Sequence, residues 1–252
     1  GLGDVYKRQV LDKNHILMEE FNLKGAKTAK SIKDLVMNSD ILITCLPSPK
    51  ICAEVLESKD GIIDTIQKDQ IWIEMSTTED EQLKKHASLI QQKNAIALEA
   101  PVSGGCHRAA TGNISIFVGG TREGFDKAMP VLKCLGRKIL YTGDFGNASI
   151  LKVITNYLAT VHLVALGEAW AIASKSNLDL NKTYKGIAAS SGNSFVHETE
   201  SQVILNGSYN INFTMDLVEK DVGLFQDLAS KLGVELELSL IHISEPTRRA
   251  LI

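Results

Sequence analysis

The sequence lacks three features that would place it in a special class of proteins. It has four cysteines but no Cys-x-x-Cys pair, which favours reduced thiols in a cytosolic compartment over a disulfide framework. It has no long run of like charge, and a net charge of -3 argues against binding nucleic acid by phosphate neutralisation. Its longest uninterrupted apolar runs, such as residues 41–46, are far too short to cross a bilayer. We therefore expect a cytoplasmic globular protein with neither nucleic acid nor a membrane as partner.

Both ends of the chain differ from what lies between them. Residues 1–9 and 239–252 resemble translated sequencing-adapter strings, so we expect them to be non-native and the natural chain to be longer at both ends. Gly1 and Gly3 look like the opening of a dinucleotide fingerprint, but no strand precedes them and Asp12 follows too closely. The first strand and the glycine-rich turn of a dinucleotide-binding domain are therefore expected to be missing.

Short apolar runs alternate with helical segments in the first part of the chain. Asn14 is expected to cap a helix that stops at Gly25, and Ser31 with Asp34 resembles a capping box. Four apolar runs are expected to be buried strands: residues 41–45, 71–73, 95–98 and 114–118. This alternation indicates an α/β fold with a mostly parallel, Rossmann-like sheet.

From Gly146 onward nearly every segment has helical periodicity. Apolar side chains recur at three- and four-residue spacing up to about Ser176. Further helices are expected at residues 180–189, 195–205 and 214–232. At 252 residues the chain is long enough for two domains. We expect an incomplete dinucleotide-binding domain at residues 10–142 and an all-α substrate and dimerisation domain at residues 143–238.

Three loops follow the predicted strands, at the sheet edge where ligands bind in such folds. They contain the candidate ligand-contacting residues Leu46, Pro47, Ser76, Thr77, Ser103, Gly104 and Gly105. Asp12 ends its strand where an acidic side chain commonly accepts hydrogen bonds from the adenine ribose of NAD, whereas Lys13 could receive the 2′-phosphate of NADP. The choice between NAD and NADP stays open.

The long helix carries two polar side chains on one face. Lys152 and Asn156 lie four residues apart, so an amine and an amide project from the same side, one turn apart. By spacing alone, a solvated lysine and a surface asparagine are the commoner interpretation. The motifs around them favour a shared small-molecule site.

Five motifs in the correct order resemble one known family. They are residues 99–105 (Glu-Ala-Pro-Val-Ser-Gly-Gly) followed by Ala109 and Gly112, the helix start at 146–156, the segment from Phe213 to Asp221, and the loops at 41–47 and 74–77. Together these are similar to the motifs of the β-hydroxyacid dehydrogenases. The resemblance implies an oxidoreductase that transfers a hydride between NAD or NADP and a small 3-hydroxy acid or its semialdehyde. It also implies a homodimer or a higher homo-oligomer.

The resemblance implies a role for each matching residue. Lys152 matches the general acid/base, and Asn156 matches the residue that orients the substrate. Ser103, with the backbone amides of Gly104 and Gly105, matches the cradle for the substrate carboxylate. Lys220 matches a second cationic group beside substrate and cofactor. Cofactor contacts are matched by Leu46, Pro47 and Thr77, with Ser76 in the same loop.

Some positions depart from the family pattern. Ala148 stands where the family often has glycine, and Cys106, His107 and Arg108 are more polar than is usual there. We expect His107 to be an exposed residue at a helix start, with contact to the substrate as the alternative. We expect no nucleophilic pair of Cys106 and His107, because adjacent residues seldom face each other on a helix. The other histidines show no metal-ligand spacing, so no metal site is expected.

Two other functions are compatible with the same fold. In oxidative decarboxylases of the 6-phosphogluconate dehydrogenase type the catalytic helix carries His-Asn-Gly after the lysine, where this chain has Thr155, Asn156 and Tyr157. A catalytically silent dimerising or binding module would be marked most clearly by loss of the lysine. Lys152 is present, although a truncated copy could still be inactive.

Overall fold

The structure, a computed structural model, describes residues 8–208 and 213–236, with the side chains of Cys106 and His107 excepted. Most of the two ends expected to be non-native therefore lies outside the described residues, as do the expectations for the Cys106 and His107 side chains. The chain divides into two compact units, the first ending at Lys152 and the second beginning at Val153. We refer to them as unit 1 and unit 2.

Unit 1 is built on one large sheet. Three neighbouring strands run parallel: β3 (Ile41–Thr44), β4 (Ile71–Glu74) and β5 (Ile96–Glu99). Three more complete it: β6 (Val102–Ser103), β7 (Ile114–Gly120) and β8 (Gly136–Gly143). The strand order is β3-β4-β5-β7-β6, and β8 also pairs with β7. The four strands predicted from apolar runs are confirmed as β3, β4, β5 and β7.

The large sheet is mostly parallel, as the sequence predicted, but it is mixed because two of its strand pairs are antiparallel. β7 runs antiparallel to β5 and β6, and parallel to β8. A parallel connection from β5 to β7 would need a crossover of a dozen or more residues, usually a helix. The segment between them contains β6 and only the five-residue helix α6 (Cys106–Ala110). The chain therefore turns back instead of crossing over.

A separate two-stranded parallel sheet contains β1 (Gln9–Val10) and β2 (Lys27–Thr28), which are connected through α1 (His15–Leu23). Asn14 caps α1 by accepting hydrogen bonds from Ile16 N–H and Leu17 N–H. After the helix, Gly25 adopts a φ of 89°, a conformation that glycine takes without strain. Both helix boundaries predicted from the sequence are confirmed.

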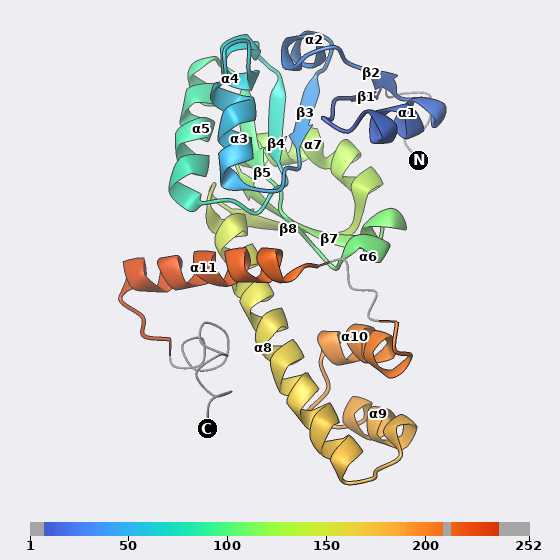
Figure 1. Ribbon diagram of the computed structural model, residues 1–252. Coiled ribbons are helices and arrows are strands. Elements are labelled where there is room, and N and C mark those ends of the chain that lie inside the picture. The colour runs from blue at the N-terminus through green and yellow to red at the C-terminus, as the bar shows by residue number, and fades with distance from the viewer. Residues whose placement is uncertain (1–7, 209–212, 237–252) are drawn as a thin grey trace. The chain divides into compact units, whose positions relative to one another are not determined.

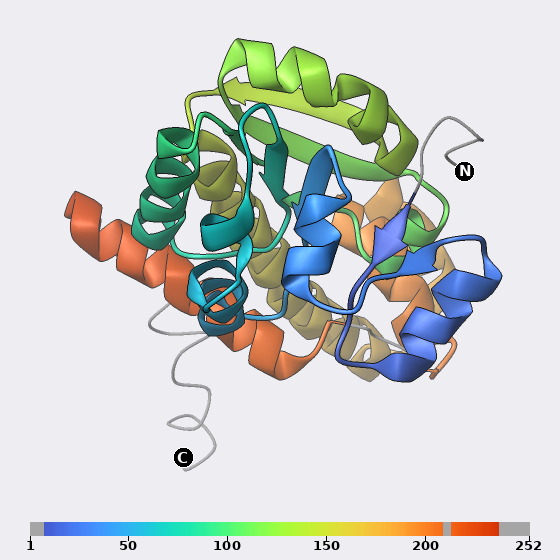
Figure 2. The same ribbon diagram turned by 90° about the horizontal axis from the view of Figure 1, so that it is seen from above.

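Helices cover both faces of the large sheet (Figures 1 and 2). One face holds α2 (Ile32–Met37), α3 (Pro49–Glu57), α4 (Ile62–Thr65) and α5 (Asp80–Gln92). The other face holds α7 (Arg122–Leu135). Because side chains alternate along a strand, Trp72 of β4 enters the first core while Ile71 and Ile73 enter the second. Unit 1 is therefore a three-layer α/β structure.

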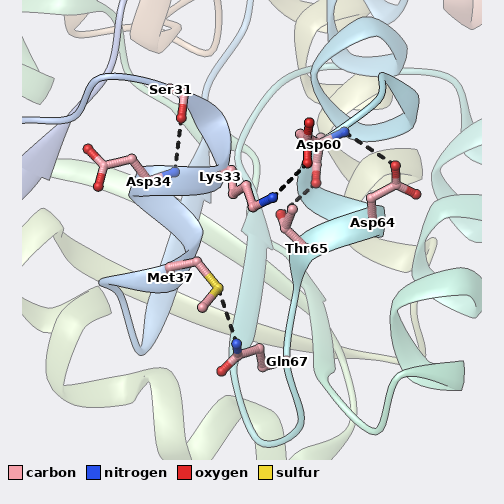
Figure 3. A network of polar contacts seen from close by, with 9 residues as sticks. Ser31, Lys33, Asp34, Met37, Asp60, Asp64, Thr65 and Gln67 are labelled. Atoms are coloured by element: carbon pink, nitrogen blue, oxygen red, sulfur yellow. Dashed lines mark hydrogen bonds and ion pairs between the residues drawn. The ribbon is translucent and has the colours of Figure 1, made fainter.

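Several polar contacts lie at the corner where α2 meets α4 (Figure 3). Ser31 Oγ accepts a hydrogen bond from Asp34 N–H at 3.1 Å, which confirms the predicted cap of α2. Lys33 Nζ lies 3.0 Å from Asp60 Oδ1, but both side chains are more than half exposed. Such exposed pairs contribute at most about 1 kcal/mol. The corner is held mainly by its buried apolar residues, such as Val36 and Ile62.

Among the described residues, the helical part contains four helices. They are α8 (Asn147–Lys175), α9 (Leu180–Ala188), α10 (Phe195–Leu205) and α11 (Met215–Leu232). All four were predicted, with ends that differ by no more than one residue. In unit 2, the C-terminal half of α8 packs against α9 and α10 through Leu166, Trp170 and Val196 (Figure 1).

The helix α8 is strongly apolar overall, although no long unbroken run of apolar residues lies within it. By length and composition alone it is long and apolar enough to cross a membrane. Polar residues such as Thr160 and His162 interrupt its apolar stretch, so no unbroken apolar run marks it in the sequence. Several of its apolar side chains are exposed, including Ile172.

A buried hydrogen-bond chain joins three helices of unit 2. The Trp170 Nε1–H group donates to Ser201 Oγ at 3.1 Å, and Ser201 Oγ lies 2.9 Å from His197 Nδ1. His197 Nε2 lies 3.1 Å from the Tyr184 carbonyl oxygen, so it must be the protonated nitrogen. With Ser201 donating to Nδ1, every polar group in this network has a hydrogen-bond partner.

Replacing Ser201 tests this chain. Ser201→Ala leaves the Trp170 and His197 nitrogens buried without their partner, so the free energy of unfolding should fall by about 1–3 kcal/mol. Thr199→Ala removes a partly buried hydroxyl that hydrogen-bonds only within the same helix, and it is the matched control. Urea unfolding of both variants provides the comparison, and equal stabilities would contradict a role for the buried chain.

Candidate active site

The carboxyl ends of β3, β4 and β5 lie at one edge of the sheet because the three strands are parallel. Two of the loops that leave this edge are tied together. Leu46 N–H donates to Ser76 Oγ at 2.7 Å, and Ala100 N–H donates to the Glu74 carbonyl oxygen at 2.6 Å. Ser76 is buried, whereas Pro47 is exposed. The structure therefore brings together the predicted residues Leu46 and Ser76, with the Ser76 hydroxyl fastening one loop to the other.

A buried carboxyl group organises the end of β4. Glu74 is 1% exposed, its Oε2 accepts a hydrogen bond from Thr44 Oγ1 at 2.8 Å, and its Oε1 accepts from Ser76 N–H at 2.8 Å. Trp72 Nε1–H donates in turn to Thr44 Oγ1 at 2.9 Å. Burial raises the pKa of Glu74, and the hydrogen bonds oppose that shift. Glu74 thus fixes both loops that carry the predicted cofactor contacts.

Cys45 lies in the same loop but has the wrong electrostatics for a nucleophile. Although Cys45 as a residue is exposed, desolvation of its thiol by the surrounding protein, followed by the charge of Glu74, raises its pKa. Because the thiolate is the reactive form, a raised pKa keeps this cysteine unreactive near neutral pH. The site therefore offers no activated thiol at Cys45.

The loop after β5 has the backbone shape expected of a carboxylate cradle. Ser103 ends β6, and Gly104 and Gly105 follow with φ angles of 132° and 82°. Both angles lie where L side chains are strained, so glycine is required at both positions. A Cβ on Gly104 would also come within 3.2 Å of Arg108 Cδ. The predicted substrate-binding residues Ser103, Gly104 and Gly105 thus form one continuous turn.

Lys152 lies near the start of α8 and is only 8% exposed. The start of this helix is tied to β5 through Glu99, whose carboxylate accepts hydrogen bonds from Gly146 N–H at 2.6 Å and from Ala148 N–H at 2.8 Å. Ala148, noted above as a departure from the family pattern, is fully buried. The predicted acid/base therefore projects from a helix that is anchored to the strand preceding the Ser-Gly-Gly turn.

In unit 2, the Asn156 and Lys220 side chains both contact Asp221. Asn156 Nδ2 donates to Asp221 Oδ2 at 2.5 Å, and Lys220 Nζ lies 2.8 Å from Asp221 Oδ1. Asp221 is 2% exposed, and the nearby rings of Tyr157 and Phe225 stack with centroids 3.9 Å apart. These contacts join α8 to α11 and fix which side of the Asn156 amide carries its oxygen.

Asp12 and Lys13 lie directly after β1, and both are exposed. Asp12 Oδ1 accepts a hydrogen bond from Asn14 N–H at 2.7 Å, so its carboxylate is held at the turn between β1 and α1. No contact in the structure distinguishes a ribose hydroxyl at Asp12 from a phosphate at Lys13. Thr77, in the loop after β4, is partly buried.

Three buried acids were missed as site residues. Glu74, Glu99 and Asp221 each position a predicted residue, yet none was chosen from the sequence. A signal existed, because Glu74 and Glu99 both end an otherwise apolar strand and Asp221 directly follows Lys220. A buried acid at the end of a strand needs hydrogen-bond donors from nearby residues, and here those donors belong to predicted site residues or to the segments that carry them.

Comparison with known proteins agrees with this geometry. Residues 4–143 match the family model described as the NAD-binding domain of 6-phosphogluconate dehydrogenase. Residues 146–242 match the model described as the NAD-binding part of NADP-dependent 3-hydroxyisobutyrate dehydrogenase. The helical part therefore resembles the hydroxyisobutyrate type rather than the decarboxylating type.

Individual relatives are similar over most of the chain. Mitochondrial 3-hydroxyisobutyrate dehydrogenase of Mus musculus is 31% identical over 89% of this chain and 69% of its own length. The 2-(hydroxymethyl)glutarate dehydrogenase of Eubacterium barkeri is 29% identical over 86% of this chain and 72% of its own. The crystal structure of 3-hydroxyisobutyrate dehydrogenase from Salmonella typhimurium superposes with a TM-score of 0.84 at 27% identity, covering 96% of this chain and 85% of that one.

A Rossmann-like sheet followed by a helical unit, with these matches along both, defines the class of protein. It is an NAD(P)-dependent hydroxyacid dehydrogenase that uses NAD or NADP. More narrowly, the chain belongs to the β-hydroxyacid dehydrogenase family. The resemblance inferred from five sequence motifs is confirmed.

The raised pKa of Glu74 predicts how the stability of the protein changes with pH. Because burial raises its pKa, the unfolded chain releases this proton at a lower pH than the folded chain does. The stability contributed by Glu74 is therefore greatest below the ordinary glutamate pKa of about 4.3 and decreases as the pH rises through the raised value. Glu74→Gln cannot ionise, so its stability relative to wild type should increase from about pH 4 to pH 7.

Urea unfolding at a series of pH values measures this difference. Glu54→Gln, on the exposed face of α3, is the matched control. A stability difference between wild type and Glu74→Gln that does not change with pH would show that the buried carboxyl is not the cause.

Proposed function

We propose that this protein oxidises a small 3-hydroxy acid, or reduces the corresponding semialdehyde, with Lys152 as the general acid/base. The observation that carries the proposal is the burial of Lys152, which is 8% exposed, on a helix anchored to the end of β5. Lysines are rarely this buried unless they are paired or have a function.

The proposed chemistry divides between the cofactor and the protein. When bound, the nicotinamide supplies the hydride acceptor or donor. In the oxidation direction Lys152 takes the hydroxyl proton as hydride leaves carbon, and in reduction it returns that proton to the oxygen. Asn156 orients the reacting hydroxyl, while Ser103 and the amides of Gly104 and Gly105 hold the substrate carboxylate. Lys220 adds a second positive charge.

The residues present suit a dinucleotide. Asp12 is exposed at the end of β1, and the loops after β3 and β4 are pinned to each other at the edge where dinucleotides bind in such sheets. We assign Leu46, Pro47, Ser76 and Thr77 to the nicotinamide side, with Lys220 beside it. Asp12 would accept from the ribose of NAD, or Lys13 would pair with the phosphate of NADP.

The names of the relatives suggest the substrate class. The substrates named for the mouse and Eubacterium barkeri enzymes both carry a hydroxymethyl group on the carbon that bears a carboxylate. A cradle of backbone amides for one carboxylate and an acid/base for one hydroxyl would recognise this shared part. We therefore propose 2-substituted 3-hydroxypropanoates as the substrate class.

Lys152→Ala tests the catalytic role. Loss of the acid/base should lower kcat by about 10²–10⁴ while NAD or NADP still binds. Oxidation of 3-hydroxyisobutyrate and 2-(hydroxymethyl)glutarate, followed by nicotinamide absorbance, gives kcat, and calorimetry gives cofactor affinity. Lys175→Ala, an exposed lysine on the same helix, is the matched control.

Two outcomes would count against this function. Unchanged turnover in Lys152→Ala would remove the lysine from the mechanism. If the wild-type chain binds dinucleotide and self-associates but turns over neither acid, the alternative of a catalytically silent binding module is favoured.

We also propose that the helical unit forms a homodimer or higher homo-oligomer. Apolar side chains of unit 2 are exposed along its helices, including Leu158 at 47% and Ile172 at 69% on α8, and Met215 at 76% on α11. Exposed apolar surface on this scale commonly marks an interface. A second copy of α8 and α11 would cover it without lipid.

Ile172→Glu tests the assembly. A charge at an apolar interface carries a large desolvation cost, so the variant should shift from oligomer to monomer in size-exclusion chromatography with light scattering. Ser174→Glu places the same charge at an exposed polar position two residues away. A monomeric wild type would contradict the proposal, and wild type that partitions onto phospholipid vesicles would favour lipid as the cover.

A further inference from the structure

We propose that Glu99 is a positioning residue for the reaction: its carboxylate fixes where α8 begins and thereby where the Lys152 amine lies. This inference rests on the acid/base role proposed for Lys152. Glu99 is fully buried at the end of β5, and none of the catalytic or binding roles proposed above is assigned to it.

The Glu99 carboxylate satisfies most of the first turn of α8. Oε1 accepts from Gly146 N–H and Ala148 N–H, and Oε2 accepts from Ser149 N–H at 3.1 Å and from the Ser149 hydroxyl. The intervening Asn147 N–H donates to the Asp144 carbonyl oxygen. The first turn of a helix has N–H groups without intrahelical partners. Here a side chain about 50 residues earlier in the sequence supplies three of the partners.

Two glycines make room for this contact. A Cβ on Gly119 would lie 2.2 Å from Glu99 Oε1, so the glycine of β7 makes the space that the carboxylate occupies. Gly146 has a φ of 109°, and a Cβ there would come within 2.7 Å of Asp80 Oδ1. Glycine is therefore needed on both sides of the contact.

The anchor is attached to the rigid part of unit 1. Glu99 is the register partner of Gly119 on one side and of Glu74 on the other, in the row of the sheet that also contains Thr44. Lys152 follows Ser149 by three residues, which is less than one helical turn and about 4.5 Å along the axis. A shift at the first turn therefore reaches the Lys152 backbone with little to absorb it.

Charge fits this role as well as geometry. All four groups that face Glu99 donate, so only the ionised carboxylate accepts from all of them. Burial raises the pKa of Glu99, while these donors oppose the shift. A negative charge at the start of a helix is also stabilised by the helix dipole. Glutamine has one acceptor oxygen and would direct its amide hydrogens at donors.

The test uses a readout that does not depend on turnover. In Glu99→Gln the first turn of α8 should loosen, and the labelling rate of the Lys152 amine by acetic anhydride, measured by peptide mass spectrometry, should change severalfold. Since small misplacements of a catalytic group are costly, kcat for 3-hydroxyisobutyrate should fall about tenfold to a hundredfold. The KM for the cofactor should stay within about twofold, because Lys152 is not assigned to cofactor binding.

Two further variants keep the test decisive if Glu99→Gln fails to fold. Ser149→Ala removes one of the donors, and Gly119→Ala fills the space of the carboxylate without altering Glu99. Both should change Lys152 labelling in the same direction. Thr121→Ala removes the side-chain cap of α7 in the same unit and is the matched control.

The outcomes separate this inference from the proposed function. If the Glu99 and Ser149 variants lose thermal stability as Thr121→Ala does, but keep wild-type labelling and kcat, Glu99 is only a structural cap and the inference is wrong. If Lys152→Ala retains full turnover, the proposed function fails, whereas altered Lys152 labelling in Glu99→Gln would still show that Glu99 positions the amine.

Discussion

The carboxylate of Glu99 joins the centre of the sheet to the first turn of α8, and the arrangement of the candidate site follows from that contact. Glu99 ends β5, so the Ser-Gly-Gly turn begins four residues later from the same anchor. Lys152 lies less than one turn beyond the groups that Glu99 accepts from. The proposed acid/base and the proposed carboxylate cradle are therefore held by one buried charge.

Glu74 holds the loops proposed to contact the cofactor, much as Glu99 holds the start of α8. The two acids are register partners on adjacent strands, yet each turns to different donors: Thr44 and Ser76 for Glu74, the start of α8 for Glu99. Burying two carboxyls this close is costly unless both are hydrogen-bonded. Both are hydrogen-bonded, so one row of the sheet holds the loops proposed to contact the cofactor and the helix that carries the proposed acid/base.

Unit 2 uses the same device with a third buried acid. Asp221 holds the Asn156 amide and the Lys220 amine on its two oxygens, and the stacked rings of Tyr157 and Phe225 reinforce that crossing of α8 and α11. The family fixes the class of reaction, an NAD(P)-dependent oxidation of hydroxy acids. The buried acids explain how residues scattered along the chain are kept in place for it.

By itself the sequence determined the elements and the class of protein. The helices of the second half, the caps at Asn14 and Ser31, and four strands could be predicted because periodicity and capping depend on neighbours only a few residues away. The five motifs likewise identified the family. The strand β8 was not predicted, because its side chains alternate weakly and Leu140 is half exposed.

Only the tertiary structure decided the direction of β7 and the partners of the three buried acids. Glu99 meets α8 across 47 to 50 positions of sequence, and Asn156 meets Asp221 across 65. No local pattern encodes which distant donor a buried carboxylate accepts from, because that choice is made when strands and helices pack and every buried polar group must find a partner.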